Sequence, residues 1–408
     1  MSKMSESDTG AFAVLTPPGR GGIAVIRCVG PRAEAAVAAA FRAVRAGAAD
    51  LPAPGALAYG HVLDADGRPI DEVILYREGP AALEVNCHGG PAAVRAVCGR
   101  LAALGLEQAD PDRLLELEGA ARLARDARRA LRRATTPLAA RILLDQLNGA
   151  LARAVEDVAR TLAPARGTSR EDSPEKHGDT EGEAIASVDA LLDRWRTCGR
   201  FLADPPRIAI AGRPNAGKST LLNRLAGAER AITSAAPGTT RDAVEAEAAL
   251  EGVPVVLVDT AGLGEPRSQV ERAGVERARR EAARAAAVVY LVDAAQEPHA
   301  EDEAALSALG GRALLALNKI DLCAAARDAP ARDAPARGGI RISALTGEGV
   351  PALVGAILSR LGWQPPPPRA AVPFTAGQAE ALHAARGALA SGRADDARRH
   401  MAHLIKAP

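Results

Sequence analysis

The sequence has few aromatic residues, few cysteines and almost no net charge. Phe, Trp and Tyr make up 2% of its 408 residues, so stacking surfaces for single-stranded nucleic acid are not indicated. The five cysteines are scattered and form no C-x-x-C pair, which argues against a disulfide framework and against zinc. The formal net charge is +1, so no overall attraction to nucleic acid or to a membrane surface is expected.

A long apolar run is also missing, and the N-terminus is polar. Secretion and membrane spanning are therefore not expected, and the protein is predicted to be cytoplasmic. Hydrophobic residues at 48% indicate a globular chain, and the length allows two or three domains. Arginine supplies nearly all the positive charge. Two of the few lysines, Lys218 and Lys319, lie in nucleotide motifs, where guanidinium cannot replace a compact ammonium.

The chain divides into four stretches. Residues 1–118 alternate short apolar runs with turn signals, with helices expected near 31–46 and 91–105, and predict an α+β domain. Residues 119–203 predict the first part of a helical domain, with a polar linker over 164–183 before the helix resumes. Residues 204–365 alternate strands with helices, and residues 366–408 add a last helical segment near 375–405.

A phosphate-binding loop opens the third stretch. The apolar strand 207–211 is followed by G-R-P-N-A-G-K-S-T and then by a helical run, which is the context that the GxxxxGK[ST] motif requires. Backbone N–H groups of such a loop curl around the β-phosphate, while Lys218 reaches the β- and γ-phosphate oxygens. The predicted contacts here are Asn215, Ala216, Gly217, Lys218, Ser219 and Thr220.

Two further segments complete the magnesium side. The apolar strand 255–258 ends in D-T-A-G, where Asp259 can hold Mg²⁺ through its water shell and Gly262 can offer its N–H to the γ-phosphate. Thr240, in the P-G-T-T-R-D segment between the two motifs, can supply a hydroxyl from a mobile switch loop. The predicted Mg²⁺ ligands are Ser219, Thr240 and Asp259, and the nucleotide contacts extend to Thr260, Ala261 and Gly262.

Guanine selectivity is predicted from N-K-I-D after the strand 313–317. The Asp321 carboxylate can accept hydrogen bonds from guanine N1–H and the exocyclic amine, a pattern that adenine does not present. Lys319 packs along the base plane, next to Asn318. A backbone N–H of the segment Ser343, Ala344 and Leu345 would reach guanine O6. Four motifs in this order predict a GTPase rather than an ATPase.

The position after D-T-A-G is Leu263, whereas Ras-like enzymes have there a glutamine that orients the attacking water. Asn215 offers a substitute, because its amide oxygen could ligate a monovalent cation that neutralises charge beside the phosphates. Asn215 is equally a common turn former. Local chemistry leaves these two interpretations open.

These motifs resemble the tRNA-modification GTPase family (MnmE, also called TrmE), and the likeness extends over much of the chain. The opening T-P-P-G-R-G-G-I from Thr16, the Y-G-H at Tyr59 and the H-G-G-P at His88 are similar to the N-terminal part of that family. The string GRPNAGKSTLLN and the run V-E-R-A-G-V-E-R from Val270 match its G domain. Both halves together make the resemblance specific, since other GTPases share P-G-T-T-R-D.

The resemblance implies a G domain inserted into a central helical domain, so that 119–203 and 366–408 form one unit. It implies a homodimer through the N-terminal domain and K⁺-stimulated hydrolysis when G domains pair, with Glu271, Asn215 and Lys218 as catalytic residues. The implied K⁺ ligands are Asn215, Ser234, Ala236 and Thr239, and the implied loop contacts to the nucleotide are Ser234, Ala235, Ala236, Pro237, Gly238 and Thr239.

The resemblance also implies a 5-formyltetrahydrofolate site as one-carbon donor for modifying the wobble uridine (position 34) of certain tRNAs, jointly with an FAD-dependent partner protein. Arg27 and Glu84 match two folate contacts of the family; its two lysine contacts, one of them in a C-terminal Cys-x-Gly-Lys, have no match here. One alternative is therefore a diverged GTP-dependent switch or binding module that has lost the modification chemistry. A ribosome-assembly GTPase is another.

Two other features suggest sites more weakly. His88 beside Cys87 could indicate a metal, but no further ligands cluster nearby in sequence, so a hydrogen-bonded structural histidine is preferred. The arginine-rich stretch 122–133 could contact tRNA phosphates. A solvated helix face is the preferred interpretation, because no aromatic residues are interleaved.

Overall fold

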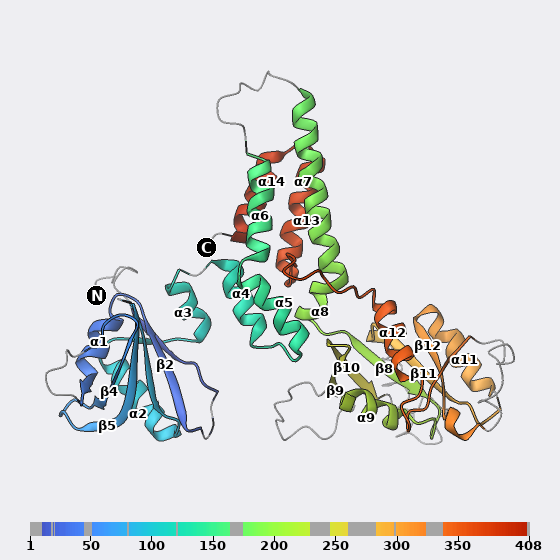
Figure 1. Ribbon diagram of the computed structural model, residues 1–408, viewed down its shortest axis with the longest axis horizontal. Coiled ribbons are helices and arrows are strands. Elements are labelled where there is room, and N and C mark those ends of the chain that lie inside the picture. Colours follow the sequence, from blue (N-terminus) through green and yellow to red (C-terminus); the bar gives the residue numbers. More distant parts are fainter. Residues whose placement is uncertain are drawn as a thin grey trace. The chain divides into compact units, whose positions relative to one another are not determined.

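The fold comes from a computed structural model that describes residues 10–17, 19, 21–44, 51–79, 81–119, 121–163, 174–228, 245–259, 283–297, 299–323 and 338–405. The chain separates into two compact units, with the division between Arg125 and Asp126. Figure 1 labels most of the elements of both units.

The first unit is built on a seven-stranded sheet in the order β3-β4-β5-β6-β2-β1-β7. Its strands pair antiparallel except for β1 with β7, which run parallel. The strands are β1 (Ala11–Val14), β2 (Ile23–Val29), β3 (Phe41–Ala43), β4 (Ala56–Leu63), β5 (Pro69–Gly79), β6 (Ala82–His88) and β7 (Glu107–Gln108). The helices are α1 (Ala33–Ala40), α2 (Pro91–Ala103) and α3 (Pro111–Leu117).

Strand periodicity divides the side chains of this sheet between two faces. Phe12 packs with residues of α1 and α2 in the main core, whereas its neighbours Ala11 and Ala13 pack with Leu114 of α3 in a smaller cluster on the other side. Farther along that second face, large apolar side chains on β4 and β5 stay exposed, namely Leu57, Tyr59 and Ile74.

The helix expected over 31–46 is wrong at its C-terminal end. The helix α1 stops at Ala40, and the chain becomes extended at Phe41 (φ −99°, ψ 141°). The buried Phe41 pairs with Val62, and its ring lies close to Gly60, where an added Cβ would lie 2.6 Å away. Tertiary packing against a glycine therefore overrides local helical composition here.

The second unit contains an α/β region and helices that precede and follow it in the sequence. The helices before it are α5 (Pro137–Leu147), α6 (Ala150–Thr161), α7 (Pro174–Arg194), a π-helical turn (Trp195–Gly199) and α8 (Arg200–Ala203), and those after it are α13 (Ala376–Ala390) and α14 (Ala394–Ile405). The helix α4 (Arg122–Leu131) spans the division between the units. Within the unit, α13 lies beside α7 and α14 beside α6 (Figure 1).

Two further expectations need correction in these helices. The linker expected over 164–183 ends earlier than its composition suggested, because α7 already begins at Pro174, and proline is compatible with a first helical turn. The last segment is two helices rather than one, because Gly392 takes a left-handed conformation (φ +68°) between α13 and α14. That conformation favours glycine and ends a helix.

The α/β region is the predicted P-loop G domain, with a six-stranded sheet in the order β13-β12-β11-β8-β10-β9. All neighbours run parallel except β9 with β10. The strands are β8 (Arg207–Gly212), β9 (Glu245–Leu250), β10 (Val253–Asp259), β11 (Ala287–Asp293), β12 (Ala313–Asn318) and β13 (Ile340–Arg341). The helices α9 (Lys218–Ala228) and α12 (Val350–Leu361) pack in one core, and α11 (Ala300–Leu309) packs in a second.

Candidate functional site

The first group of predicted residues lies where β8 passes into α9. The Lys218 Nζ donates to the carbonyls of Gly212 and Arg213, each at 3.0 Å. Burial lowers the pKa of Lys218, and attraction to Asp259 acts against that shift. Four buried residues of β8, from Ile208 to Ala211, hold the start of the loop rigidly in the sheet.

The loop backbone needs three left-handed conformations. Gly212 (φ +144°) and Gly217 (φ +97°) have no room for a side chain, because an added Cβ would lie 2.3 Å from Leu291 O and from Asn318 Nδ2, respectively. Asn215 also has a positive φ of 63°, a conformation that asparagine tolerates better than most residues. Asn215 is thus a turn residue in this loop, whatever else it binds.

A hydroxyl from the start of α9 meets a carboxylate at the end of β10. The Ser219 Oγ donates to Asp259 Oδ2 at 3.1 Å. The other carboxylate oxygen, Asp259 Oδ1, is buried and has no hydrogen-bond partner among the described residues. Oxygen donors of this kind are those that Mg²⁺ prefers, and a buried oxygen without a partner favours a cation.

The predicted base-recognition residues follow β12 and are tied to the phosphate loop. Asn318 is buried; its Nδ2 donates to Ala216 O at 2.7 Å, and its Oδ1 accepts from Ala344 N at 2.8 Å. A single side chain therefore connects the phosphate loop to the segment 343–345. The Asp321 Oδ1 is buried and has no hydrogen-bond partner among the described residues, as a carboxylate reserved for a ligand would be.

Two residues of this region, Asp293 and Arg224, were not found from the sequence. The carboxylate of Asp293, at the end of β11, lies 2.7 Å from the Lys319 Nζ, and Arg224 of α9 donates to the carbonyls of Ala344 and Leu345. Neither belongs to a nucleotide motif. The one available signal for Asp293 was a carboxylate directly after the apolar run 287–292.

Some predicted residues lie outside the described part of the chain. The segments 229–244 and 260–282 contain Leu263 and the predicted site residues Ser234, Ala235, Ala236, Pro237, Gly238, Thr239, Thr240, Thr260, Ala261, Gly262 and Glu271. Their roles stay predictions. Lys218, Ser219, Asp259, Asn318 and Asp321 come together at the carboxyl ends of β8, β10 and β12, where α/β sheets bind ligands.

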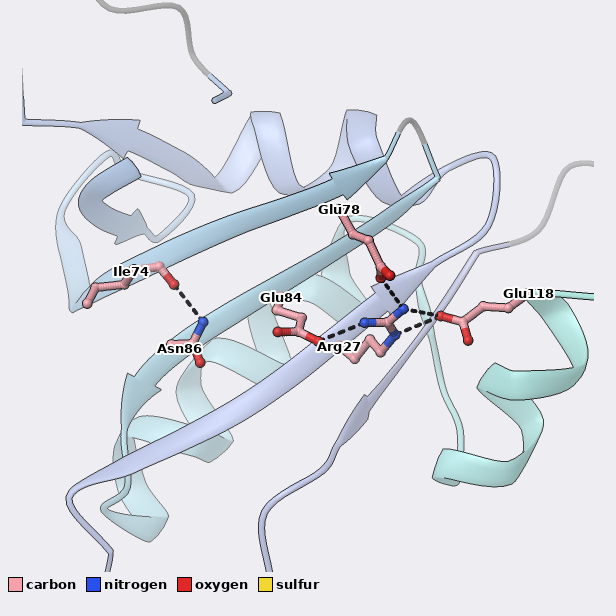
Figure 2. A network of polar contacts seen from close by, with 6 residues as sticks. All are labelled: Arg27, Ile74, Glu78, Glu84, Asn86 and Glu118. Atoms are coloured by element: carbon pink, nitrogen blue, oxygen red, sulfur yellow. Dashed lines mark hydrogen bonds and ion pairs between the residues drawn. The ribbon is translucent and has the colours of Figure 1, made fainter. Parts of the chain in front are cut away.

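A separate polar network lies in the first unit and contains both predicted folate contacts (Figure 2). The Arg27 Nη1 donates to Glu84 Oε1 at 2.7 Å and the Nε donates to Glu118 Oε1 at 2.7 Å, while the Nη2 donates to Glu78 Oε2 at 2.5 Å. Burial alone would lower the pKa of Arg27. The hydrogen bonds to Glu78 and Glu118, and the negative charges of these two residues, outweigh that effect, so the pKa of Arg27 is raised above its ordinary value. The sequence identified Arg27 and Glu84, and missed the other two carboxylates.

The structure tests one of the two weaker candidates, His88. Its Nδ1 lies 2.7 Å from Asp71 Oδ1, and this hydrogen bond raises the pKa of His88. His88 is thus a hydrogen-bonded histidine, the interpretation preferred from the sequence. Among the described residues, three or more His, Cys, Asp or Glu side chains do not come together in a group suited to a metal ion. None of the described helices has the length and apolar character needed to span a bilayer.

Known protein families match both the N-terminal part and the α/β region of the chain. The family profile described as 50S ribosome-binding GTPase matches residues 207–319, and the profile described as GTP-binding protein TrmE N-terminus matches residues 11–113. The chain is 36% identical to the tRNA modification GTPase MnmE of Parasynechococcus marenigrum over 390 residues, which is 88% of this chain and 83% of that protein. It is 37% identical to MnmE of Aromatoleum aromaticum over 376 residues, 86% of this chain and 81% of that protein.

Solved structures also resemble parts of the chain. The Aquifex aeolicus Era variant bound to GDP·AlF4⁻ is 28% identical, covers 45% of this chain and 66% of its own, and has a TM-score of 0.32. The G domain of the T. maritima FeoB iron transporter is 24% identical, covers 38% of this chain and 98% of its own, and has a TM-score of 0.29.

Proposed function

The chain belongs to the MnmE family of tRNA-modification GTPases, and from this we propose that it couples GTP hydrolysis to modification of the wobble uridine of certain tRNAs. The chain is a GTPase. The observation that carries the assignment of its site is the pairing of a phosphate loop with a base-recognition segment through one side chain, Asn318. The experiment is deletion of the gene followed by mass spectrometry of wobble uridines; unchanged tRNA would refute the proposal.

The nucleotide site is proposed to bind GTP and GDP with Mg²⁺. Ser219 and Asp259 would hold the ion, with Thr240 as a further ligand, because a hydroxyl lies against a carboxylate whose second oxygen is buried without a described partner. Bound Mg²⁺ neutralises charge that develops on the phosphate oxygens. Lys218, at the N-terminus of α9, would turn from the carbonyls of Gly212 and Arg213 to the β- and γ-phosphates.

Hydrolysis is proposed to depend on K⁺ and on transient pairing of two G domains. Asn215 is exposed at the turn of the phosphate loop, so its amide oxygen is available to a cation. The segment Ser234–Thr239 would supply the other ligands of that cation. Glu271 would position the attacking water indirectly. A cation beside the phosphates would do the work of an arginine finger.

The G domain is proposed to be an insertion in one helical domain, with boundaries at 119–203, 204–365 and 366–408. Contacts between residues that precede it and residues that follow it in the sequence support this. The Gln146 Nε2 donates to Ala370 O at 3.1 Å and its Oε1 accepts from Val372 N at 3.0 Å, and Arg386 of α13 pairs with Asp189 of α7. Residues that precede the G domain and residues that follow it in the sequence would then share a single core.

The N-terminal domain, residues 1–118, is proposed to form a homodimer and to hold 5-formyltetrahydrofolate at Arg27 and Glu84. The exposed apolar side chains of Leu57, Tyr59 and Ile74 support an interface on the same sheet, because apolar side chains gathered on one face of a domain often mark an interaction surface. The working complex would include an FAD-dependent partner and tRNA, and would be cytoplasmic.

One observation favours a second candidate, a GTP-dependent switch that lacks the one-carbon chemistry. Arg27 contacts three carboxylates, from Glu78, Glu84 and Glu118, so the network carries an excess of negative charge. An anionic folate would meet repulsion there unless one carboxylate moves away. Wobble-uridine modification that is unchanged by the deletion, together with intact GTP hydrolysis, would support this candidate instead.

A further inference from the structure

The helix that follows the phosphate loop also contacts the segment that is predicted to recognise the base. Arg224 lies on α9, and its Nε donates to Ala344 O at 2.5 Å. Its Nη2 donates to the next carbonyl along the chain, that of Leu345. A planar guanidinium can hold two adjacent acceptors at once, which a lysine ammonium on its flexible stem does not reproduce.

The turn after these carbonyls is shaped to admit the guanidinium. Gly347 has a positive φ of 93°, and a Cβ added to it would lie 2.8 Å from Arg224 Nη1. The backbone N–H of Gly347 donates to Ser343 O at 2.8 Å, which closes the turn. Lack of a side chain at Gly347 therefore keeps the space that Arg224 occupies.

The contacts of Arg224 determine where one backbone N–H points. In a trans peptide the C=O and the following N–H lie on opposite edges, and none of the described peptide bonds is cis. Since the Ala344 carbonyl faces Arg224, the N–H of Leu345 faces the opposite way. The N–H of Ala344 is already donated to Asn318 Oδ1, which leaves the Leu345 N–H as the better placed donor for guanine O6.

These hydrogen bonds connect the phosphate loop, the segment 344–345 and α9 to one another. Asn318 joins Ala216 of the phosphate loop to Ala344, and Arg224 joins Ala344 and Leu345 back to α9, whose first residue is Lys218. The segment 344–345 is thus held from two sides. A charge-assisted bond to the Ala344 carbonyl also polarises its peptide group and strengthens the Leu345 N–H as a donor.

We propose that Arg224 is a positioning residue for guanine selectivity, holding the Leu345 N–H toward the 6-oxo group of the bound base. This inference rests on the proposed nucleotide site. The sequence already predicts an O6 contact from the segment 343–345, beside Asp321, which would read the N1–H and the 2-amino group of guanine. The inference specifies the Leu345 N–H as that donor and Arg224 as the side chain that orients it. Arg224 itself does not touch the base in this proposal.

The test measures binding of three nucleoside diphosphates to the full chain by calorimetry with Mg²⁺. GDP and IDP both carry the 6-oxo group, and IDP lacks only the 2-amino group. The riboside diphosphate of 2-aminopurine keeps the 2-amino group but lacks the 6-oxo group and, with it, the N1–H. In Arg224→Gln, GDP and IDP should each bind roughly fivefold more weakly, the change expected for loss of one ordinary hydrogen bond. The 2-aminopurine nucleotide should weaken by less than about twofold, since it has no contact with the Leu345 N–H to lose.

Two further variants keep the result interpretable. Arg224→Lys retains the charge but loses the bidentate hydrogen bonding. It should therefore weaken GDP and IDP selectively, as Arg224→Gln does, but to a smaller extent. Arg360→Gln changes an exposed arginine on α12 and should match the wild type on all three ligands. Equal weakening of all three nucleotides in both Arg224 variants, or no change in any, would overturn the inference. Wild-type protein that fails to bind GDP would instead refute the proposed nucleotide site, and the inference with it.

Discussion

The ammonium of Lys319 lies 2.7 Å from the carboxylate of Asp293, although 26 residues separate them in sequence. The two side chains leave the ends of neighbouring parallel strands, β12 and β11. Lys319 has a left-handed backbone (φ 66°), a conformation that costs a non-glycine residue about 1 kcal/mol or more. The ion pair fixes the lysine stem where it can lie along the plane of a base.

Asp293→Asn should weaken GDP binding. The carboxylate is largely buried, at 11% exposed, so loss of the pair should cost about 1 kcal/mol, or roughly fivefold in the GDP dissociation constant. Fluorescent GDP displacement measures this. Asp395→Asn, which removes an exposed pair with Arg398 on α14, is the control and should leave affinity unchanged. Unaltered GDP affinity in Asp293→Asn would mean that Lys319 does not need the ion pair with Asp293 in order to bind the base.

Asp321→Asn should shift nucleotide preference from GTP towards XTP. An asparagine amide can donate to the 2-oxo group of xanthine, whereas only a carboxylate accepts from both the N1–H and the 2-amino group of guanine. The variant keeps one acceptor oxygen but loses the charge, and its amide NH2 faces a donor of guanine, so GTP should bind roughly a hundredfold more weakly. Competition binding with both nucleotides is the measurement. Wild-type GTP affinity in the variant would contradict the assignment of Asp321.

Hydrolysis should be faster in KCl than in NaCl at equal ionic strength, and the difference should disappear in Asn215→Ala. The physical reason is that K⁺ held by the Asn215 amide would neutralise phosphate charge in the transition state. Multiple-turnover phosphate release is the measurement, with GDP affinity as a check that the loop still binds nucleotide. Equal rates in both salts for the wild type would leave Asn215 as a turn residue alone.

Folate binding should depend on the carboxylates around Arg27. Calorimetry with 5-formyltetrahydrofolate on the intact chain should detect binding, lost in Arg27→Gln. Glu118→Gln should bind several-fold tighter, because it removes one of three carboxylates that compete for the guanidinium. Absence of any heat with wild-type protein would favour the switch that lacks one-carbon chemistry.

Gly199→Ala should destabilise the helical part of the second unit. A Cβ at Gly199 would lie 1.7 Å from Pro373 O, so backbone must move and about 1–3 kcal/mol of unfolding free energy should be lost. Thermal unfolding followed by circular dichroism reports this. Gly387→Ala, in the middle of α13 with open space around it, should instead be neutral or stabilising. A Gly199 variant as stable as the wild type would argue against close packing of 366–408 on the first helices.

The nucleotide chemistry of this protein follows from local sequence motifs. Motifs such as G-x-x-x-x-G-K-S and N-K-I-D are local: each needs a few adjacent residues at the end of a strand, so their type and order predicted a G domain without any tertiary information. Apolar periodicity likewise predicted most helices and strands. It failed at Phe41, where packing beside Gly60 outweighs the helical tendency of the preceding alanines, and at Pro174, where a polar composition concealed the start of a helix.

Tertiary structure decided which side chains meet across the sequence. Asp293 reaches Lys319 because β11 and β12 are neighbours, and Arg224 reaches Ala344 because α9 packs beside the segment that follows β13. In the first unit, Glu78 and Glu118 surround Arg27 from β5 and from the end of α3. Such contacts depend on strand order and helix packing, which are properties of the whole fold. They cannot be predicted from a single sequence, because neither a residue's type nor its neighbours in the sequence indicate which distant residue it contacts.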